Sequence, residues 1–197
     1  MKLTLKHALA AIILVLSFST PVTAGPVEDA AAALGRGDYA TALRLIRPLA
    51  DQGDAYAQYN LGLRYANGQG VPQNYEEARK WYRLAADQGN TRSQFRLGVL
   101  YADGHGVPQN DAEALKWYRR AADRGNALAQ YNLGVRYANG QGVTQDYGRA
   151  HLWFNLSAAR GNQEAVRYRD EVEQNMTPAQ IAEAQKLVRE WRLKPQP

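Results

Sequence analysis

The sequence predicts an all-α fold, a solenoid of antiparallel helix pairs stacked side by side. Nearly the same stretch occurs at residues 59–82, 95–118 and 131–154, at a spacing of 36 residues. In each copy, apolar and small residues recur at helical steps of three and four on both sides of a glycine-rich segment. The chain has no cysteine, so apolar burial between stacked units must hold the fold.

Residues 1–24 have the pattern of a secretory signal peptide. Lys2 and Lys6 give a basic start, an apolar run extends from Leu9 to Phe18, and small residues end the segment at Ala24. An uncleaved membrane anchor is the alternative, but the apolar run is about half of the roughly 20 residues that a spanning helix needs. We therefore expect export, to the periplasm or alternatively out of the cell, with no stable membrane insertion after the leader is removed.

Residues 25–52 form a degenerate first helix pair. A short helix is expected at 27–34. The second helix, within 37–53, keeps the repeat register, because Ala42 and Ala50 align with Ala78 and Ala86.

The complete units are 53–88, 89–124 and 125–160. Equivalent positions carry the same residue in all three units. In the first unit these are Gln58, Leu61, Gly62, Tyr65 and Ala66 in the first helix, and Ala78, Trp81 and Ala86 in the second. Each unit is therefore predicted to be helix, turn, helix.

The glycine-rich turns are predicted to be connections and not nucleotide loops. A glycine just past a helix suits a left-handed C-cap. Asn74, Asn110 and Asp146 are suitable N-caps for the second helices. A dinucleotide fingerprint needs a third glycine after a strand, whereas here Gln73, Gln109 and Gln145 take that place after a helix.

Gly62, Gly98 and Gly134 lie inside the predicted first helices, where each costs roughly 1 kcal/mol relative to alanine. We expect a packing reason: close approach of a bulky neighbour, namely Trp81, Trp117 or Trp153 from a second helix.

Residues 161–192 are expected to form C-terminal capping helices. Gly161-Asn162 opens one, and Thr177-Pro178-Ala179-Gln180 opens the last with a capping-box pattern. Ile181, Ala184, Val188 and Trp191 give the last helix an apolar stripe. Residues 193–197 are expected to be a loose tail.

These units resemble Sel1-like repeats, relatives of the tetratricopeptide repeat. The pattern A-x-A-Q-Y-N-L-G-x-x-Y-A-x-G-x-G-V-x-Q-(N/D)-x-x-x-A-x-x-W-Y runs through 53–160, and the likeness extends over about 37–192. The third unit departs from it at Thr144 and Gly148, and the second at Asp111. The resemblance implies a right-handed superhelix whose first helices line the inner surface and hold other proteins.

The sequence offers little for catalysis, and we expect neither an enzyme nor a cofactor or metal site. His105 and His151 lie in different elements and are expected to be solvated. Ser93 and Ser157 have no nucleophile-elbow context. Some cysteine-rich Sel1-like proteins have been proposed to bind or hydrolyse β-lactams, but this chain lacks their cysteines. The formal net charge of +5 is spread along the sequence, so no nucleic-acid partner is expected.

The face of the first helices complementary to the shared residues is the candidate binding groove. Arginine forks suit carboxylates and peptide groups, and asparagine can pair with an extended main chain. The predicted floor consists of Tyr56, Asn60, Arg64, Asn67, Arg92, Arg96, Leu100, Asp103, Leu128, Asn132, Arg136 and Asn139. The alternative is that these are ordinary solvated residues.

The sequence thus predicts a non-catalytic, exported adaptor that binds a peptide or protein surface. Two alternatives stay open: an envelope enzyme or binder of cell-wall or β-lactam ligands, and a secreted effector that binds host proteins through the same surface.

Overall fold

A computed structural model describes residues 25–193 as a succession of helices, with no strand in that range. The signal-peptide prediction and most of the predicted tail therefore lie outside the described residues. The helices are α1 (Pro26–Gly35), α2 (Tyr39–Asp51), α3 (Ala55–Asn67), α4 (Tyr75–Asp87), α5 (Thr91–Asp103), α6 (Asp111–Asp123), α7 (Ala127–Asn139), α8 (Tyr147–Ala158), α9 (Gln163–Glu173) and α10 (Pro178–Leu193).

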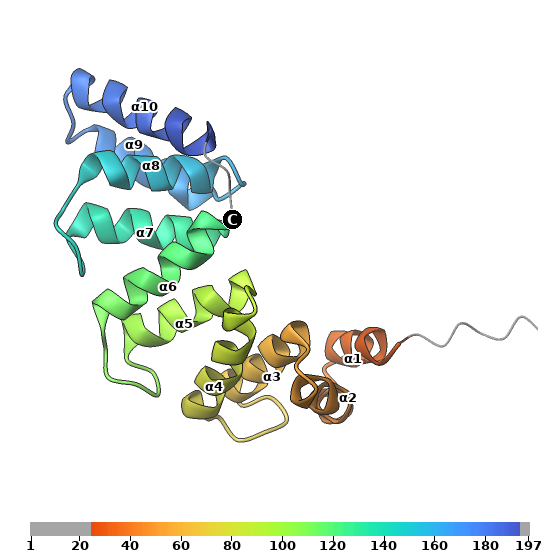
Figure 1. Cartoon of the computed structure of the whole chain (residues 1–197). Coiled ribbons are helices and arrows are strands. Elements are labelled where there is room, and N and C mark those ends of the chain that lie inside the picture. Colours follow the sequence, from red (N-terminus) through yellow and green to blue (C-terminus); the bar gives the residue numbers. More distant parts are fainter. Residues whose placement is uncertain (1–24, 194–197) are drawn as a thin grey trace, which may run out of the picture.

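The helices follow one another along a curved array, with α1 and α2 at one end and α10 at the other (Figure 1). Each of α3, α5 and α7 packs both on the helix that follows it and on the helix that precedes it. Neighbouring pairs therefore bury each other's apolar faces, as the predicted α-solenoid requires.

The predicted caps are confirmed. Gly68, Gly104 and Gly140 follow α3, α5 and α7 in the left-handed conformation, with φ of 66°, 70° and 69°. Asn74 Oδ1 accepts a hydrogen bond of 3.0 Å from the Glu77 N–H at the start of α4, and Asn110 and Asp146 cap α6 and α8 in the same way. The turns are thus helix connections.

The second glycine of each turn also joins neighbouring units. A Cβ built on Gly70 would lie 2.7 Å from Leu43 Cδ1 of α2, and one on Gly106 would lie 2.7 Å from Tyr75 Cβ of α4. Each turn therefore presses against the second helix of the preceding unit, where no larger residue fits without displacement.

Close approach at the helix-interior glycines is confirmed, but the predicted partner is wrong. A Cβ on Gly62 would lie 2.6 Å from Cδ1 of Tyr82, not against Trp81. The corresponding rings are Tyr118 over Gly98 and Phe154 over Gly134. Each of these aromatic residues directly follows the tryptophan of its second helix. Because one residue turns a helix by about 100°, the aromatic residue faces the first helix of the same unit and the tryptophan does not.

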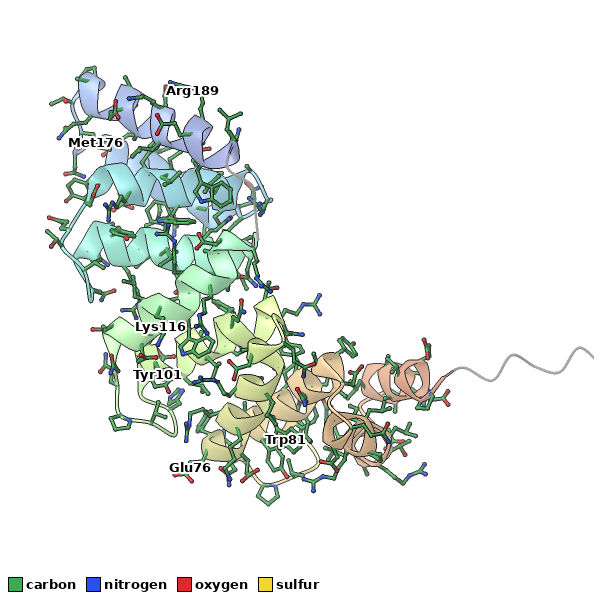
Figure 2. All side chains as sticks on the ribbon, in the orientation of Figure 1. Glu76, Trp81, Tyr101, Lys116, Met176 and Arg189 are labelled. Carbon is green, nitrogen blue, oxygen red and sulfur yellow. The ribbon has the colours of Figure 1, made fainter. Side chains whose placement is uncertain are left out.

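The tryptophans pack between units. Trp117 of α6 is fully buried in a cluster with Ala78 and Tyr82 of the preceding unit. Trp153 of α8 is also buried and meets the Trp191 ring of α10 edge-on at 6.0 Å. Trp81, labelled in Figure 2, is only half-buried and packs on the α1–α3 cluster.

The capping helices form as predicted. Thr177 and Gln180 make the reciprocal capping-box bonds, 2.7 Å from the Thr177 N–H to Gln180 Oε1 and 3.3 Å from the Gln180 N–H to Thr177 Oγ1. Helix α10 lies on α8, with Ala184 and Val188 buried. Arg189 points away from the stack (Figure 2). Within residues 25–193, no helix is long and apolar enough to cross a membrane.

Candidate binding surface

The first helices are fixed in register by a buried glutamine at the start of each. Gln58 Nε2 donates to the Ala50 carbonyl at the end of the preceding helix, at 3.2 Å. Gln94 and Gln130 make the same bond to Ala86 and Ala122, at 3.1 and 3.0 Å. Because these bonds repeat, α3, α5 and α7 are held in the same way against the preceding helix, and their equivalent positions form rows along the stack.

One row of the predicted groove is exposed and partly apolar. Tyr56, Arg92 and Leu128 occupy the same position of α3, α5 and α7. Tyr56 is 43% exposed and Leu128 is 54% exposed, and Arg92 is also exposed. In the next row, Arg96 is exposed between Asn60 and Asn132. These two rows offer apolar contact beside guanidinium donors.

The two asparagines of the second row each already use one of their two amide N–H donors. Asn60 Nδ2 donates to the Tyr56 carbonyl and Asn132 Nδ2 to the Leu128 carbonyl, both at 2.9 Å. Asn60 is buried and Asn132 half-buried. Each amide keeps a second N–H and its Oδ1 atom for pairing with an extended main chain, and the burial of Asn60 restricts access to its groups.

The third row lies largely inside the protein. Leu100 is part of the core cluster around Trp117. Arg64 is 8% exposed and its guanidinium lies 5.2 Å from the Tyr39 ring centroid. Arg136 is equally buried, forms an ion pair of 2.7 Å with Asp111, and stacks over the Tyr118 ring. The sequence predicted that these residues line the groove, whereas in the structure they pack inside the protein. Sequence position alone does not show that the preceding unit covers them.

The fourth row, Asn67, Asp103 and Asn139, ends the three helices directly before the glycine C-caps, and all of its members are exposed. The structure therefore leaves the first row, Arg96 of the second row and the helix ends accessible, and it encloses Asn60 and the third row.

Burial also affects the tyrosines beneath this surface. Desolvation raises the pKa of Tyr118 to about 12, against a smaller opposing effect of Arg136. Desolvation likewise raises the pKa of Tyr82 far above its ordinary value. Both phenols are therefore neutral packing groups, and neither is an acid or base at ordinary pH.

Comparison with protein families decides the identity of the units. The model of the Sel1 repeat matches three times, at 55–90, 91–126 and 127–162. The chain belongs to the Sel1 repeat family. The matched repeats keep the 36-residue period and start two residues later than the units predicted from the sequence.

Solved structures include similar Sel1 repeat proteins. A Sel1 repeat protein from Oxalobacter formigenes is 34% identical with a TM-score of 0.66, and the match covers 69% of this chain and 56% of that one. The protein c5321, a protective antigen of uropathogenic Escherichia coli strains with an SLR fold, is 41% identical with a TM-score of 0.64, over 69% of this chain and 32% of that one. This chain thus spans about half of the first protein and a third of the second.

Helicobacter pylori cysteine-rich protein B is 15% identical with a TM-score of 0.51 and supports the fold alone. The comparison with curated proteins found no match. Sel1 repeats generally mediate protein–protein interactions, which is consistent with a non-catalytic adaptor.

The residues considered for chemistry serve the Sel1 fold. Ser157 Oγ donates to the Ala127 carbonyl at 2.7 Å, and Ser93 is buried in α5. His105 is exposed and stacks on the Tyr75 ring of the preceding repeat, 4.6 Å between centroids. The expectation of a solvated His151 is wrong: this side chain is 1% exposed, with Nε2 2.7 Å from Glu173 Oε1. The His151–Glu173 contact joins α8 to the capping helix α9, and the sequence did not indicate that Glu173 would lie beside His151.

The sequence reasoning missed a second polar surface, at the junction of the first two Sel1 repeats. A depression of about 580 Å³ lies between the ends of α4 and α6 and the start of α5. Arg120, which lines it, stands where the flanking repeats have Leu84 and Leu156. That departure from the repeat was the available signal.

Proposed function

We propose that the protein is an exported, non-catalytic interaction scaffold that binds a peptide segment or protein surface on α3, α5 and α7. The observation that carries this is the exposed row of Tyr56, Arg92 and Leu128 at one repeat position. Exposed apolar side chains at an equivalent position, with a guanidinium between them, offer a partner both apolar area and charge-assisted hydrogen bonds.

The physical mechanism is a preformed surface. Because the Gln58, Gln94 and Gln130 bonds fix the helices before a partner arrives, the scaffold side loses little conformational freedom on binding. Affinity then comes from distributed contacts along the stack, and the partner supplies most of the ordering cost.

Crosslinking tests this surface directly. A photo-reactive amino acid replaces Arg96 in one protein and Lys116, exposed on α6, in a control protein. The same partner should be trapped from Arg96 and not from Lys116. A Tyr56→Ser, Leu128→Ser double variant should then lose most of that trapping.

The matched control is Leu84→Ser, which removes an exposed leucine of similar accessibility from α4. This variant should trap the partner as well as the unchanged protein does. Trapping that is equal from Arg96 and Lys116, or unaffected by the double variant, would remove the first-helix surface from the proposal.

Export is the second part of the proposal and rests on the composition of residues 1–24. Fractionated cultures should contain a mature protein that begins at Gly25. Finding the protein in the periplasm favours the adaptor, and finding it in the medium favours a secreted effector using the same surface. No observation on residues 25–193 favours the alternative of an enzyme or a β-lactam binder.

A further inference from the structure

The depression between the first two repeats is built differently from its counterparts at the flanking junctions. Its lining comes from Ala86, Asp87, Gln88, Gly89, Gln94, Arg120, Asp123 and Arg124. None of these residues belongs to the first-helix surface of the proposed function. The two surfaces can therefore succeed or fail independently.

The first distinctive feature is a buried acceptor without a donor. Gln58 Oε1 accepts from Gln88 Nε2 at 2.8 Å, and Gln130 Oε1 lies 3.5 Å from Arg160 Nη1. The equivalent Gln94 is 4% exposed, and within residues 25–193 no group donates to its Oε1. An unpaired buried carbonyl oxygen is unfavourable, so it favours a ligand that carries an N–H group.

Arg124 is the residue that would be expected to pair with Gln94, since it occupies the position of Gln88 and Arg160. Its Nη1 instead donates to the Gly89 carbonyl at 3.0 Å. Gln94 and Arg124 both line the depression, and Gln94 Oε1 has no donor within the described residues at the place where the flanking junctions supply one.

The second distinctive feature is a positioned cation. The Arg120 guanidinium lies 4.8 Å from the Trp117 ring centroid, and Trp117 is fully buried. Stacking on an indole orients the planar guanidinium and leaves its edge N–H groups for a planar anion. The flanking repeats have leucine at this position and cannot offer such a group.

The two acids in the lining are already paired. Asp87 accepts twice from Arg83 Nε, at 2.9 and 3.1 Å, and Asp123 accepts twice from Arg119 Nε, at 3.0 and 3.1 Å. The Asp87 and Asp123 carboxylates therefore do not neutralise Arg120 and Arg124 directly, and an arriving anion meets two guanidinium groups.

We propose that this depression binds the C-terminal end of a peptide. The terminal carboxylate pairs with Arg120 and Arg124, and a peptide N–H close to that carboxylate donates to Gln94 Oε1. The C-terminal residue of a peptide carries a carboxylate and a peptide N–H close together. This combination matches the two guanidinium groups of Arg120 and Arg124 beside the unpaired Gln94 Oε1. The volume of about 580 Å³ lies within the range of small-ligand sites and accommodates a few residues.

The test follows the NMR signals of the isotope-labelled protein during titration with N-acetyl-tetraalanine bearing a free carboxylate. The Gln94 side-chain amide and the Gly89 N–H signals should shift in a saturable manner. The same peptide with a C-terminal amide should produce no such shift. An amidated peptide with an internal glutamate separates a chain terminus from an acidic side chain, and should bind at least about tenfold more weakly.

Two variants test the arginines with residues that the neighbouring repeats already tolerate. Arg120→Leu copies Leu84 and Leu156, and Arg124→Gln copies Gln88. Each should weaken binding about tenfold or more, the loss of one charge-assisted hydrogen bond. Arg160→Gln, the equivalent change one junction later, should leave binding unchanged.

Unaltered spectra away from the depression verify that each variant is folded. The proposal is overturned if the free-acid and amidated peptides shift the same signals equally, if neither shifts them, or if Arg120→Leu binds like the unchanged protein. None of these outcomes affects the crosslinking test of the first-helix surface.

Discussion

Gly98 of α5 lies directly against the ring of Tyr118 of α6: a Cβ on this glycine would lie 2.5 Å from Tyr118 Cδ1. Gly62 with Tyr82 and Gly134 with Phe154 repeat the relationship. Within every complete unit, the missing side chain of the first helix makes room for an aromatic ring of the second. The helix pair is therefore joined by a contact that only glycine allows.

Gly98→Ala should destabilise the protein by about 1–3 kcal/mol, because the added methyl group overlaps the ring in a packed core. Helix propensity alone predicts the opposite, a gain of about 1 kcal/mol. Urea unfolding distinguishes the two. Gly35→Ala is the control, since a Cβ at Gly35 meets nothing within 4 Å. It should not destabilise, and a stabilised Gly98→Ala variant would contradict the close approach.

Gln130→Leu should destabilise the protein by about 1–3 kcal/mol, because it leaves the Ala122 carbonyl at the repeat junction without its buried donor. Gln94→Leu should cost less. It breaks the equivalent bond to Ala86 but also removes the Oε1 atom that has no donor within the described residues. Chemical denaturation of both variants gives the comparison. Equal losses would show that the unpaired oxygen carries no penalty.

Arg136→Glu should lower stability by about 1–3 kcal/mol, because it replaces the Asp111 ion pair with like-charge repulsion and removes the stacking on Tyr118. This differs from the sequence-based prediction that Arg136 lies on the accessible floor of the binding groove. Arg92→Glu, on the exposed row, is the matched control and should change the unfolding temperature little. If both variants unfold alike, the packing role of Arg136 is wrong.

Alkaline pH should destabilise the protein partly through Tyr118. Burial raises the pKa of its phenol to about 12, above the ordinary value of about 10. Between these values the unfolded chain loses the proton and the folded chain keeps it, so stability falls as pH rises. Tyr118→Phe, which copies Phe154, should reduce that decline by up to about 1.4 kcal/mol per pH unit. Equal slopes of unfolding free energy against pH would contradict this.

An excised unit, residues 89–124, should show no cooperative thermal unfolding by circular dichroism. Trp117 is sheltered by Ala78 and Tyr82, which belong to the preceding unit. The full chain provides the cooperative reference transition. A sharp transition in the isolated unit would mean that stacking is not needed to form the core.

The sequence was sufficient for the helices and their caps, because local signals determine them: Asn74 and Thr177 bond to residues three positions away. It was less informative about contacts between units. Helical steps showed that Gly98 needs a large neighbour but not whether Trp117 or Tyr118 faces it. Periodicity placed Arg136 on the groove-facing side of α7, and only the position of Asp111 on the preceding unit shows that it is enclosed. The docking of Glu173 against His151 likewise depends on tertiary geometry.

The glutamine-to-carbonyl bond at each repeat junction has a consequence for how such a chain changes in length. Every junction uses the same donor and acceptor positions, 36 residues apart. Removing 89–124 would place Gln130 beside Ala86, and duplicating it would place a second Gln94 beside Ala122. Gain or loss of whole units by recombination thus preserves every joint, whereas an insertion of any other length within a helix shifts one glutamine away from its carbonyl.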